Sequence, residues 1–423
     1  MPPAHDRTTG NGGSGDEELT LGFIPLVDCA PLVVAAEIGF AEAEGIRLRL
    51  MRETSWANIR DRVMLGHFDG AHMLGPMPIA ATLGIAQIEQ AMVAPIALGL
   101  GGNAVTLSQP LFEAMAGRAG VTVGDGPAAM GKALAEVVEA RRAAKGPPLT
   151  FAAVYPFSGH NYELRYWLAA SGIDPDADVR ITVLPPPFIV DALARGRIDG
   201  FCVGEPWSSI AVDADVGTIV TTKSALWRQS PEKVLGMQAA FAARHPERVA
   251  ALVRAIWRAG AWLSEPEHIE AAAELLARPG YVGVAPEVIV RSLSCRIVCG
   301  HDGAPLRVPD FLVFSDHAAN FPWRSHALWF YSQMVRWGQT DFDRGAAHRA
   351  HNVYRPDLYR AALEGTDADL PNAGAKVEGA LTIETPVASR RGKLTLGPDG
   401  FFDGMLFDPD AVENYIRSFS IPR

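Results

Sequence analysis

The sequence predicts an α/β fold of two similar lobes, because one order of strands and helices occurs twice along the chain. The later copy spans residues 149–206 and the earlier copy spans residues 19–78. In the later copy, apolar runs and turn residues predict strand, helix, strand, helix and strand in turn, at about 149–154, 160–170, 180–184, 186–195 and 198–203.

The two copies are related by a constant offset of 130 residues. The matched pairs are Leu19 and Leu149, Gly66 and Gly196, Asp69 and Asp199, Gly70 and Gly200, and Pro76 and Pro206. In each copy this pattern is typical of a helix that ends on glycine, a tight Asp-Gly turn, and a strand that stops at proline. Chance similarity of two ordinary βαβ units is the alternative. A true duplication predicts two lobes with a cleft between them.

Two helices of the later copy begin with residues suited to an anion. Ser158 and Gly159 precede His160, and three consecutive prolines open the second helix at 185–187. Serine caps a helix start, and proline there loses no hydrogen bond. The free N–H groups at such a start attract negative charge.

The remaining elements fill out the lobes and a C-terminal extension. The chain is expected to cross into the second lobe near residue 105 and to return near residues 205–207, so that lobe I resumes at residue 210. Lobe I then comprises 19–104 and 210–423, which includes a helical and β extension, and lobe II comprises 105–209. Further helices are expected at 31–43, 107–116, 126–144, 246–263, 267–277, 286–294, 308–318 and 325–337, with a hairpin within 392–407 and a closing helix after Asp408.

Composition excludes several classes of protein. The 423 residues carry 38 basic and 48 acidic side chains, a net charge of −10, and no basic stripe of the kind that binds nucleic acid. The four cysteines form no Cys-x-x-Cys pair, which favours buried thiols over a disulfide framework or a zinc site. No run of 18 or more apolar residues indicates a membrane span.

Residues 1–18 lack the apolar core of an export signal and are expected to form a disordered tail. On that basis the chain is expected to be cytoplasmic.

Three side chains at expected strand ends and helix starts are candidate ligand contacts. Trp56 begins a helix after Thr54 and Ser55, and its indole can lie against a flat ligand or simply fill the core. Asn103 follows a glycine-rich strand end and offers two amide donors, unless the segment is a plain turn. Lys233 precedes an apolar run that draws its stem inward, although a solvated lysine is the alternative.

Enzyme signatures with usable spacing are absent from the sequence, including nucleophile elbows, Walker loops, dinucleotide fingerprints and His-Glu-x-x-His. His67 and His72 flank an Asp-Gly turn and are interpreted as structural. His348 and His351 can share a helical face, but a third ligand is not evident. Glu205 lies nearest the expected return crossing, where a structural carboxylate is favoured over a weak metal contact.

A set of motifs spread over residues 19–423 resembles the nitrate- and bicarbonate-binding proteins of ABC transporters. These motifs are TSWAN, FDGAHML, GNAVTLS, SGHNYELRYWLAASGI, PPP, DGFCVGEPW, PEKVLGM, WFYSQMVRWG and FDP. The resemblance implies a type II periplasmic-binding-protein fold, whose two lobes are joined by a hinge and close on a ligand. It also implies a binding protein rather than an enzyme, although thiamine-precursor synthases share the superfamily. The sequence itself gives no sign of a cofactor or a metal.

At the positions where nitrate-binding members hold their anion, this sequence has Trp56, Asn103, His160, Pro186 and Lys233. Nitrate is a flat monoanion that accepts hydrogen bonds and donates none, and these residues suit it. Nitrite can use the same donors. Bicarbonate binders of the family use a metal, and the acidic cluster that such a site needs is not evident along the chain.

Because an export signal is not evident, the chain is similar to the NasS-type cytoplasmic nitrate/nitrite sensors derived from this family. That resemblance implies a protein partner, a NasT-like RNA-binding antiterminator of nitrate-assimilation genes, which is held without ligand and released with it. The alternative is the substrate-binding component of a nitrate or bicarbonate ABC transporter. In either case, replacing Lys233 or His160 with alanine is expected to abolish nitrate binding without affecting folding.

Overall fold

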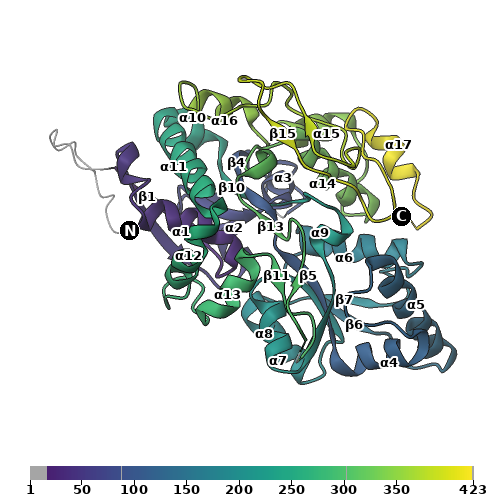
Figure 1. Ribbon diagram of the computed structural model, residues 1–423. Coiled ribbons are helices and arrows are strands. Elements are labelled where there is room, and N and C mark those ends of the chain that lie inside the picture. The colour runs from purple at the N-terminus through teal and green to yellow at the C-terminus, as the bar shows by residue number, and fades with distance from the viewer. Residues whose placement is uncertain (1–16, 87, 302, 422–423) are drawn as a thin grey trace, which may run out of the picture.

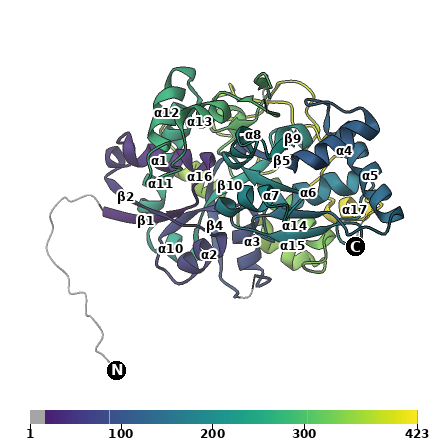
Figure 2. The ribbon, with the colours of Figure 1, turned by 90° about the horizontal axis from the view of Figure 1, so that it is seen from below.

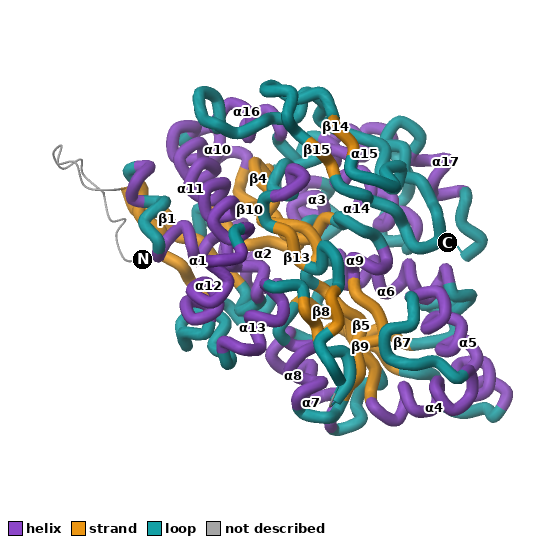
Figure 3. The backbone as a smooth tube through the Cα atoms, in the orientation of Figure 1, coloured by secondary structure: helices purple, strands orange, loops and turns teal. Residues whose placement is uncertain are grey.

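The computed structural model describes residues 17–86, 88–301 and 303–421, and the chain forms two lobes, each with its own sheet (Figures 1 and 3). Most of the expected tail lies outside the described residues, but Glu17 and Glu18 already belong to the first strand. We call the six-stranded sheet and its helices lobe I, and the five-stranded sheet and its helices lobe II.

The lobe I sheet has the strand order β13-β4-β10-β3-β1-β2, and the lobe II sheet has the order β7-β6-β8-β5-β9. The lobe I strands are β1 (Glu17–Phe23), β2 (Ile46–Arg52), β3 (Gly70–Leu74), β4 (Met92–Gly101), β10 (Pro231–Gln238) and β13 (Leu312–Val313). The lobe II strands are β5 (Asn103–Ser108), β6 (Thr150–Ala153), β7 (Arg180–Val183), β8 (Gly200–Gly204) and β9 (Gly217–Thr222). Two short ribbons pair β11 (Arg296–Ile297) with β12 (Leu306–Arg307) and β14 (Thr385–Pro386) with β15 (Thr395–Leu396).

Five strands of each lobe follow one plan. Read from one edge, β2-β1-β3-β10-β4 in lobe I corresponds to β7-β6-β8-β5-β9 in lobe II, with parallel pairs first and antiparallel pairs after them. The chain passes from β4 into β5, and it returns from β9 into β10. The fourth strand in this order is β10 in lobe I and β5 in lobe II. Each of them is the first strand that the chain forms after it has crossed from the other lobe.

Equivalent hydrogen bonds in the two lobes confirm the predicted duplication. Asp69 accepts a bond from the N–H of Thr20 at 2.8 Å, and Asp199 accepts the corresponding bond from Thr150 at 2.7 Å. The strand registers match as well, since Leu21 pairs with Gly70 in lobe I and the residues 130 positions later pair in lobe II. The repeated Asp is therefore needed because its carboxylate ties the turn before the third strand to the first strand.

Helices cover both sheets, and α11 is the longest of them (Figures 1 and 2). The helices are α1 (Ala30–Glu37), α2 (Trp56–Met64), α3 (Pro76–Thr82), α4 (Gln109–Ala119), α5 (Pro127–Ala143), α6 (Gly159–Ala170), α7 (Ile189–Ala194), α8 (Trp207–Asp213), α9 (Lys223–Leu226), α10 (Ala239–Arg244), α11 (Pro246–Ser264), α12 (Ile269–Leu276), α13 (Pro286–Leu293), α14 (Arg324–Arg336), α15 (Arg344–His351), α16 (Pro356–Ala362) and α17 (Val412–Arg417). Short 3-10 turns occur at η1 (Val27–Cys29), η2 (Glu42–Glu44), η3 (Pro186–Phe188), η4 (Pro266–His268) and η5 (Asp316–Ala318).

Three local predictions are wrong. The return crossing lies later than residue 210, because β9 pairs with β5 and so belongs to lobe II. The helix expected at 308–318 is replaced by β13, which pairs with the edge of β4. The hairpin expected within 392–407 does not form, because β15 pairs with β14 and Phe401 stacks on Trp227 with ring centres 4.5 Å apart.

The C-terminal extension, which we define as residues 324–421, contacts both lobes, since α14 lies against α3 of lobe I and α6 of lobe II (Figure 1). Tyr162 of α6 donates a hydrogen bond to Gln339 at 2.6 Å, and Tyr166 of the same helix donates to Asp403 at 2.8 Å. Phe419 packs edge-on against the Tyr166 ring with centres 5.7 Å apart. The extension therefore holds α6 of lobe II against the rest of the chain.

Candidate functional site

The candidate site lies where the two lobes meet, around the start of β10. Lys233 is almost fully buried, and its Nζ atom lies 2.7 Å from Asp28 Oδ2 and 2.7 Å from Glu232 Oε1. Successive strand residues normally point to opposite faces. Here the register between β10 and β4 shifts on both sides of Lys233, a bulge that allows Glu232 and Lys233 to reach the same cluster.

Trp56 lies beside Lys233 at the first position of α2. Ser55 caps this helix by accepting a hydrogen bond from the N–H of Asn58 at 3.2 Å, as its position in the sequence predicts. The Trp56 ring centre is 5.5 Å from Lys233 Nζ and 5.4 Å from the ring of His72. Its indole Nε1 is buried and has no hydrogen-bond partner among the described residues.

Asn103 begins β5, immediately after the crossing from lobe I. Its side-chain nitrogen donates to Glu232 Oε2 at 2.9 Å and to Glu163 Oε2 at 3.3 Å. Its side-chain oxygen is buried and, within the part of the chain that the structure describes, has no partner. The amide group of Asn103, which the sequence analysis expects to donate to a ligand, therefore donates to Glu163 and Glu232 of the protein itself.

His160 is the second residue of α6, which Ser158 caps by accepting a hydrogen bond from the N–H of Asn161 at 3.0 Å. Burial is the main cause that lowers the pKa of His160 to about 3, so the imidazole is neutral near pH 7. Its Nε2 lies 3.6 Å from Glu232 Oε1, which is too long for a hydrogen bond. Neither ring nitrogen has a partner among the described residues.

Pro186 is buried at the start of η3, in the run of prolines seen in the sequence. The ion pairs, hydrogen bonds and ring contacts described above connect Trp56, Asn103, His160 and Lys233 through Glu232, and they do not include Pro186. The structure thus brings four of the five predicted residues into one cluster.

Five further residues of the cluster are not among the predicted site residues: Asp28, His72, Glu163, Lys223 and Glu232. Lys223 begins α9 and forms ion pairs with both Glu163 and Glu232. His72 Nε2 lies 3.0 Å from Asp28 Oδ1, so this histidine is structural, as interpreted, but it belongs to the cluster. His67, by contrast, is exposed.

The sequence signals for these residues were weak. Glu163 lies in a helix whose neighbouring residues are mostly apolar, and Lys223 directly follows a buried strand. A charged residue in such a setting has to find a buried partner. Asp28, Glu163 and Glu232 come from three distant segments and are paired with lysines in the folded chain, but they do not form the metal-binding acidic cluster of a bicarbonate site.

The cluster contains three carboxylates and two ammonium groups, and their pKa values follow from that arrangement. Burial alone would raise the pKa of Asp28, but Lys233 and His72 outweigh it and lower that pKa to about 2. Burial raises the pKa of Glu163, and the opposing effect of Lys223 does not cancel it. Glu163 therefore binds a proton most readily among these carboxylates.

Glu205 of lobe II forms hydrogen bonds with the first crossing between the lobes and with lobe I. Its backbone N–H donates to the carbonyl of Gly102 at 3.0 Å, and its carbonyl accepts from the N–H of Val27 at 2.8 Å. Its side chain accepts from the N–H of Ser209 at 3.2 Å. Burial is the main cause that raises the pKa of Glu205 to about 7.

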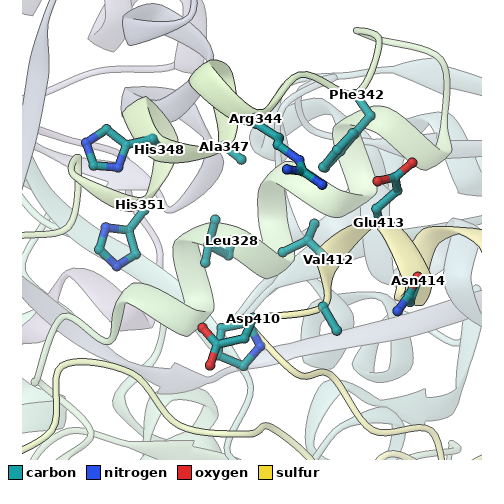
Figure 4. A pocket seen from close by; sticks show the side chains of 12 residues that line it. Leu328, Phe342, Arg344, Ala347, His348, His351, Asp410, Val412, Glu413 and Asn414 are labelled. Carbon is teal, nitrogen blue, oxygen red and sulfur yellow. The ribbon is translucent and has the colours of Figure 1, made fainter.

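A separate open pocket of about 540 Å³ lies between α14, α15 and α17 (Figure 4). His348 and His351 lie side by side on its wall, with ring centres 6.3 Å apart. Arg344 and Glu413 line the same pocket. None of the five predicted site residues lines this pocket, so we do not assign the candidate site to it.

Among residues 17–86, 88–301 and 303–421, no group of three or more His, Cys, Asp or Glu side chains is arranged to hold a metal ion. Every helix in these segments falls short of the length and apolarity that crossing a bilayer requires. All four cysteines are free thiols.

Comparison with known proteins places the chain in a family. Residues 12–277 match the NMT1-like family. The chain belongs to this family. An NMT1-like fold agrees with the solved structures, since the periplasmic nitrate-binding protein NrtA from Synechocystis superposes with a TM-score of 0.83 at 28% identity, covering 96% of this chain and 98% of that one.

Curated relatives of this NMT1-like chain include transport proteins. The nitrate/nitrite binding protein NrtA of Synechococcus elongatus is 32% identical over 98% of the chain and 88% of its own length. The nitrate import ATP-binding protein NrtC of Synechocystis is 36% identical over 97% of the chain, which spans 57% of that relative. The chain is thus a homologue of nitrate- and bicarbonate-transport proteins, and it has the periplasmic-binding-protein fold.

Proposed function

We propose that this protein binds nitrate or nitrite between its two lobes, as the substrate-binding component of an ABC transporter. The site we assign to the anion comprises Trp56, Asn103, His160, Pro186 and Lys233. The names of the relatives support an anion of this class, because NrtA proteins that match nearly the whole chain are named for nitrate and nitrite.

One observation carries the proposal. His160 is neutral and fully buried, and both of its ring nitrogens lack a hydrogen-bond partner among the described residues. A neutral imidazole has one N–H to donate, and an unpaired buried donor costs roughly 1–3 kcal/mol. A ligand that only accepts hydrogen bonds removes this cost, and the unpaired Trp56 Nε1 offers a second donor. Nitrate and nitrite are acceptors of this kind.

The direct test is calorimetric titration of the purified protein with nitrate, nitrite and bicarbonate. We expect saturable binding of nitrate or nitrite at one site, and loss of that binding in His160→Ala. The matched control is His326→Ala, since His326 is also fully buried and lies 3.4 Å from a glutamate, Glu378, in the C-terminal extension. Equal affinities in all three proteins would rule out the assigned site, and bicarbonate binding alone would rule out the assigned anion.

A second candidate function is the cytoplasmic NasS-type sensor, which binds the same anions and releases a NasT-like antiterminator. The net charge of −10 supports it, because an acidic protein can pair with a basic RNA-binding partner while avoiding RNA itself. Co-purification with candidate partners, with and without nitrate, separates the two functions. The sensor predicts a regulatory protein that nitrate releases, whereas the transporter component predicts a periplasmic location and association with a permease.

A further inference from the structure

The carboxylate of Glu232 accepts hydrogen bonds from Asn103 and Lys233, two of the residues that the proposed function assigns to the bound anion. Oε1 accepts from Lys233 Nζ at 2.7 Å, and Oε2 accepts from Asn103 Nδ2 at 2.9 Å. Lys223 forms an ion pair with Oε2, and His160 Nε2 lies 3.6 Å from Oε1. A side chain of the protein thus occupies the centre of the cluster.

The same carboxylate lies against the start of α6. Gly159 is the first residue of this 12-residue helix, and a Cβ atom at this position would collide with Glu232 Oε2. Glycine therefore permits the close approach of the carboxylate to the helix backbone. The start of a helix carries partial positive charge, so the sequence feature that suggested an anion site faces the protein's own anion.

Carboxylate and nitrate have matching chemistry. Both are planar, carry one negative charge and accept hydrogen bonds in the plane of their oxygens. The N–H groups with which Lys233 and Asn103 bind Glu232 cannot at the same time form full hydrogen bonds to an oxyanion. Binding in this position therefore requires Glu232 to move away.

Glu232 also connects the lobes. It belongs to β10 of lobe I, whereas Asn103, His160 and Lys223 belong to β5, α6 and α9 on the lobe II side. An anion that binds between the lobes of such a fold would make the same kind of bridge. In this structure the Glu232 carboxylate itself makes such a bridge.

Charge explains why the Glu232 carboxylate and a bound nitrate exclude each other from the same position. Asp28, Glu163 and Glu232 already face only Lys223 and Lys233, so a further monoanion would place four negative groups against two ammonium groups. Outward rotation of Glu232 restores the original balance. The neutral histidines His72 and His160 add no positive charge.

We propose that Glu232 is an internal competitor of the ligand, which occupies the oxyanion position in the ligand-free protein, holds the lobes together and sets the affinity of the site. This inference rests on the proposed function for its ligand. The lobe-bridging role of Glu232, however, can be measured without nitrate.

The main test is calorimetry with nitrate on the wild type and Glu232→Gln, which keeps the shape and removes the charge. We expect Glu232→Gln to bind nitrate about tenfold more tightly. The matched control is Glu378→Gln, because Glu378 is a fully buried carboxylate paired with Lys376 and near His326, outside the site. Its nitrate affinity is expected to equal that of the wild type. Equal or weaker binding by a folded Glu232→Gln would overturn the proposal.

A second measurement keeps the inference independent of nitrate. Small-angle scattering of the ligand-free proteins is expected to give a larger radius of gyration for Glu232→Gln than for the wild type and Glu378→Gln. Formate, a free carboxylate, is expected to return Glu232→Gln to the wild-type value. If no protein binds nitrate or nitrite, the proposed function fails, and this scattering result alone decides the role of Glu232. An unchanged radius would then overturn it.

Should Glu232→Gln fail to fold, Glu232→Asp provides the same test with the charge retained. The shorter side chain draws the carboxylate back from Asn103 and the α6 start, so nitrate affinity and ligand-free radius are expected to rise by smaller amounts. Unchanged values for a folded Glu232→Asp would argue against the competitor role.

Discussion

The ammonium group of Lys233 lies 5.5 Å from the centre of the Trp56 ring, so a buried cation from β10 faces the indole at the start of α2. A cation at this distance from an indole gains about 0.5–2 kcal/mol, more when water is excluded. The indole therefore adds to the ion pairs with Asp28 and Glu232 that hold the ammonium group, while its own Nε1 has no hydrogen-bond partner among the described residues.

Trp56→Phe is expected to weaken nitrate binding about fivefold to tenfold, because the phenyl ring keeps the contact with Lys233 but removes the N–H donor. Calorimetry with nitrate measures this change. The control is Trp227→Phe, since Trp227 is equally buried and its Nε1 is also unpaired in the described part of the chain, but it packs against the C-terminal extension. A weaker affinity in both variants would point to a general loss of stability instead.

Lys233→Met is expected to destabilise the protein as well as weaken anion binding. The change leaves Asp28 and Glu232 buried without their shared partner, which typically costs about 3–5 kcal/mol. The expectation from sequence, that removing Lys233 leaves folding unaffected, overlooked this ion pairing. Urea unfolding of Lys233→Met and of the double variant Lys233→Met/Asp28→Asn measures the cost. The double variant should recover part of the lost stability, and no recovery would contradict the pairing.

Stability is expected to fall as pH rises from about 4.5 to about 7, in part because of Glu205. Burial raises the pKa of this carboxyl from 4.5 to about 7 in the folded protein. The folded state then binds more protons than the unfolded state in this pH range, so its advantage is complete below pH 4.5 and is lost as pH passes 7. Thermal melts of the wild type and Glu205→Gln across this range test it. Glu205→Gln should lose part of the pH dependence, and an unchanged profile would exclude the carboxyl.

The repeated turns are expected to contribute equally to stability. Asp69→Ala and Asp199→Ala each remove a hydrogen bond from a carboxylate to a backbone N–H, worth about 1–3 kcal/mol for a charged acceptor. Because the two turns lie in different sheets, their costs should add in the double variant. Denaturant unfolding of the two single variants and the double variant measures this. A large difference between the single variants would show that the lobes do not use the repeated Asp alike.

Local patterns in the sequence determined the duplicated part of the fold. The Asp-Gly turns, the helix starts at Ser55 and Ser158 and the order of strands depend on contacts between neighbours or on short repeats, which a sequence displays directly. The duplication predicted the two lobes, and the family motifs added the type II periplasmic-binding-protein fold. Proximity of Trp56, Asn103, His160 and Lys233 followed from the expectation that strand ends and helix starts meet between lobes. Their role in anion binding stays a prediction.

Only the tertiary structure decided what surrounds those residues. Asp28, Glu163, Lys223 and Glu232 come from segments far apart in the chain, and a bulge in β10 directs Glu232 and Lys233 to one place. Periodicity cannot reveal such a cluster, because the free energy of a buried charge depends on partners that folding brings near. The same holds for the C-terminal extension, where contacts with α6 outweigh the local turn signals that suggested a hairpin.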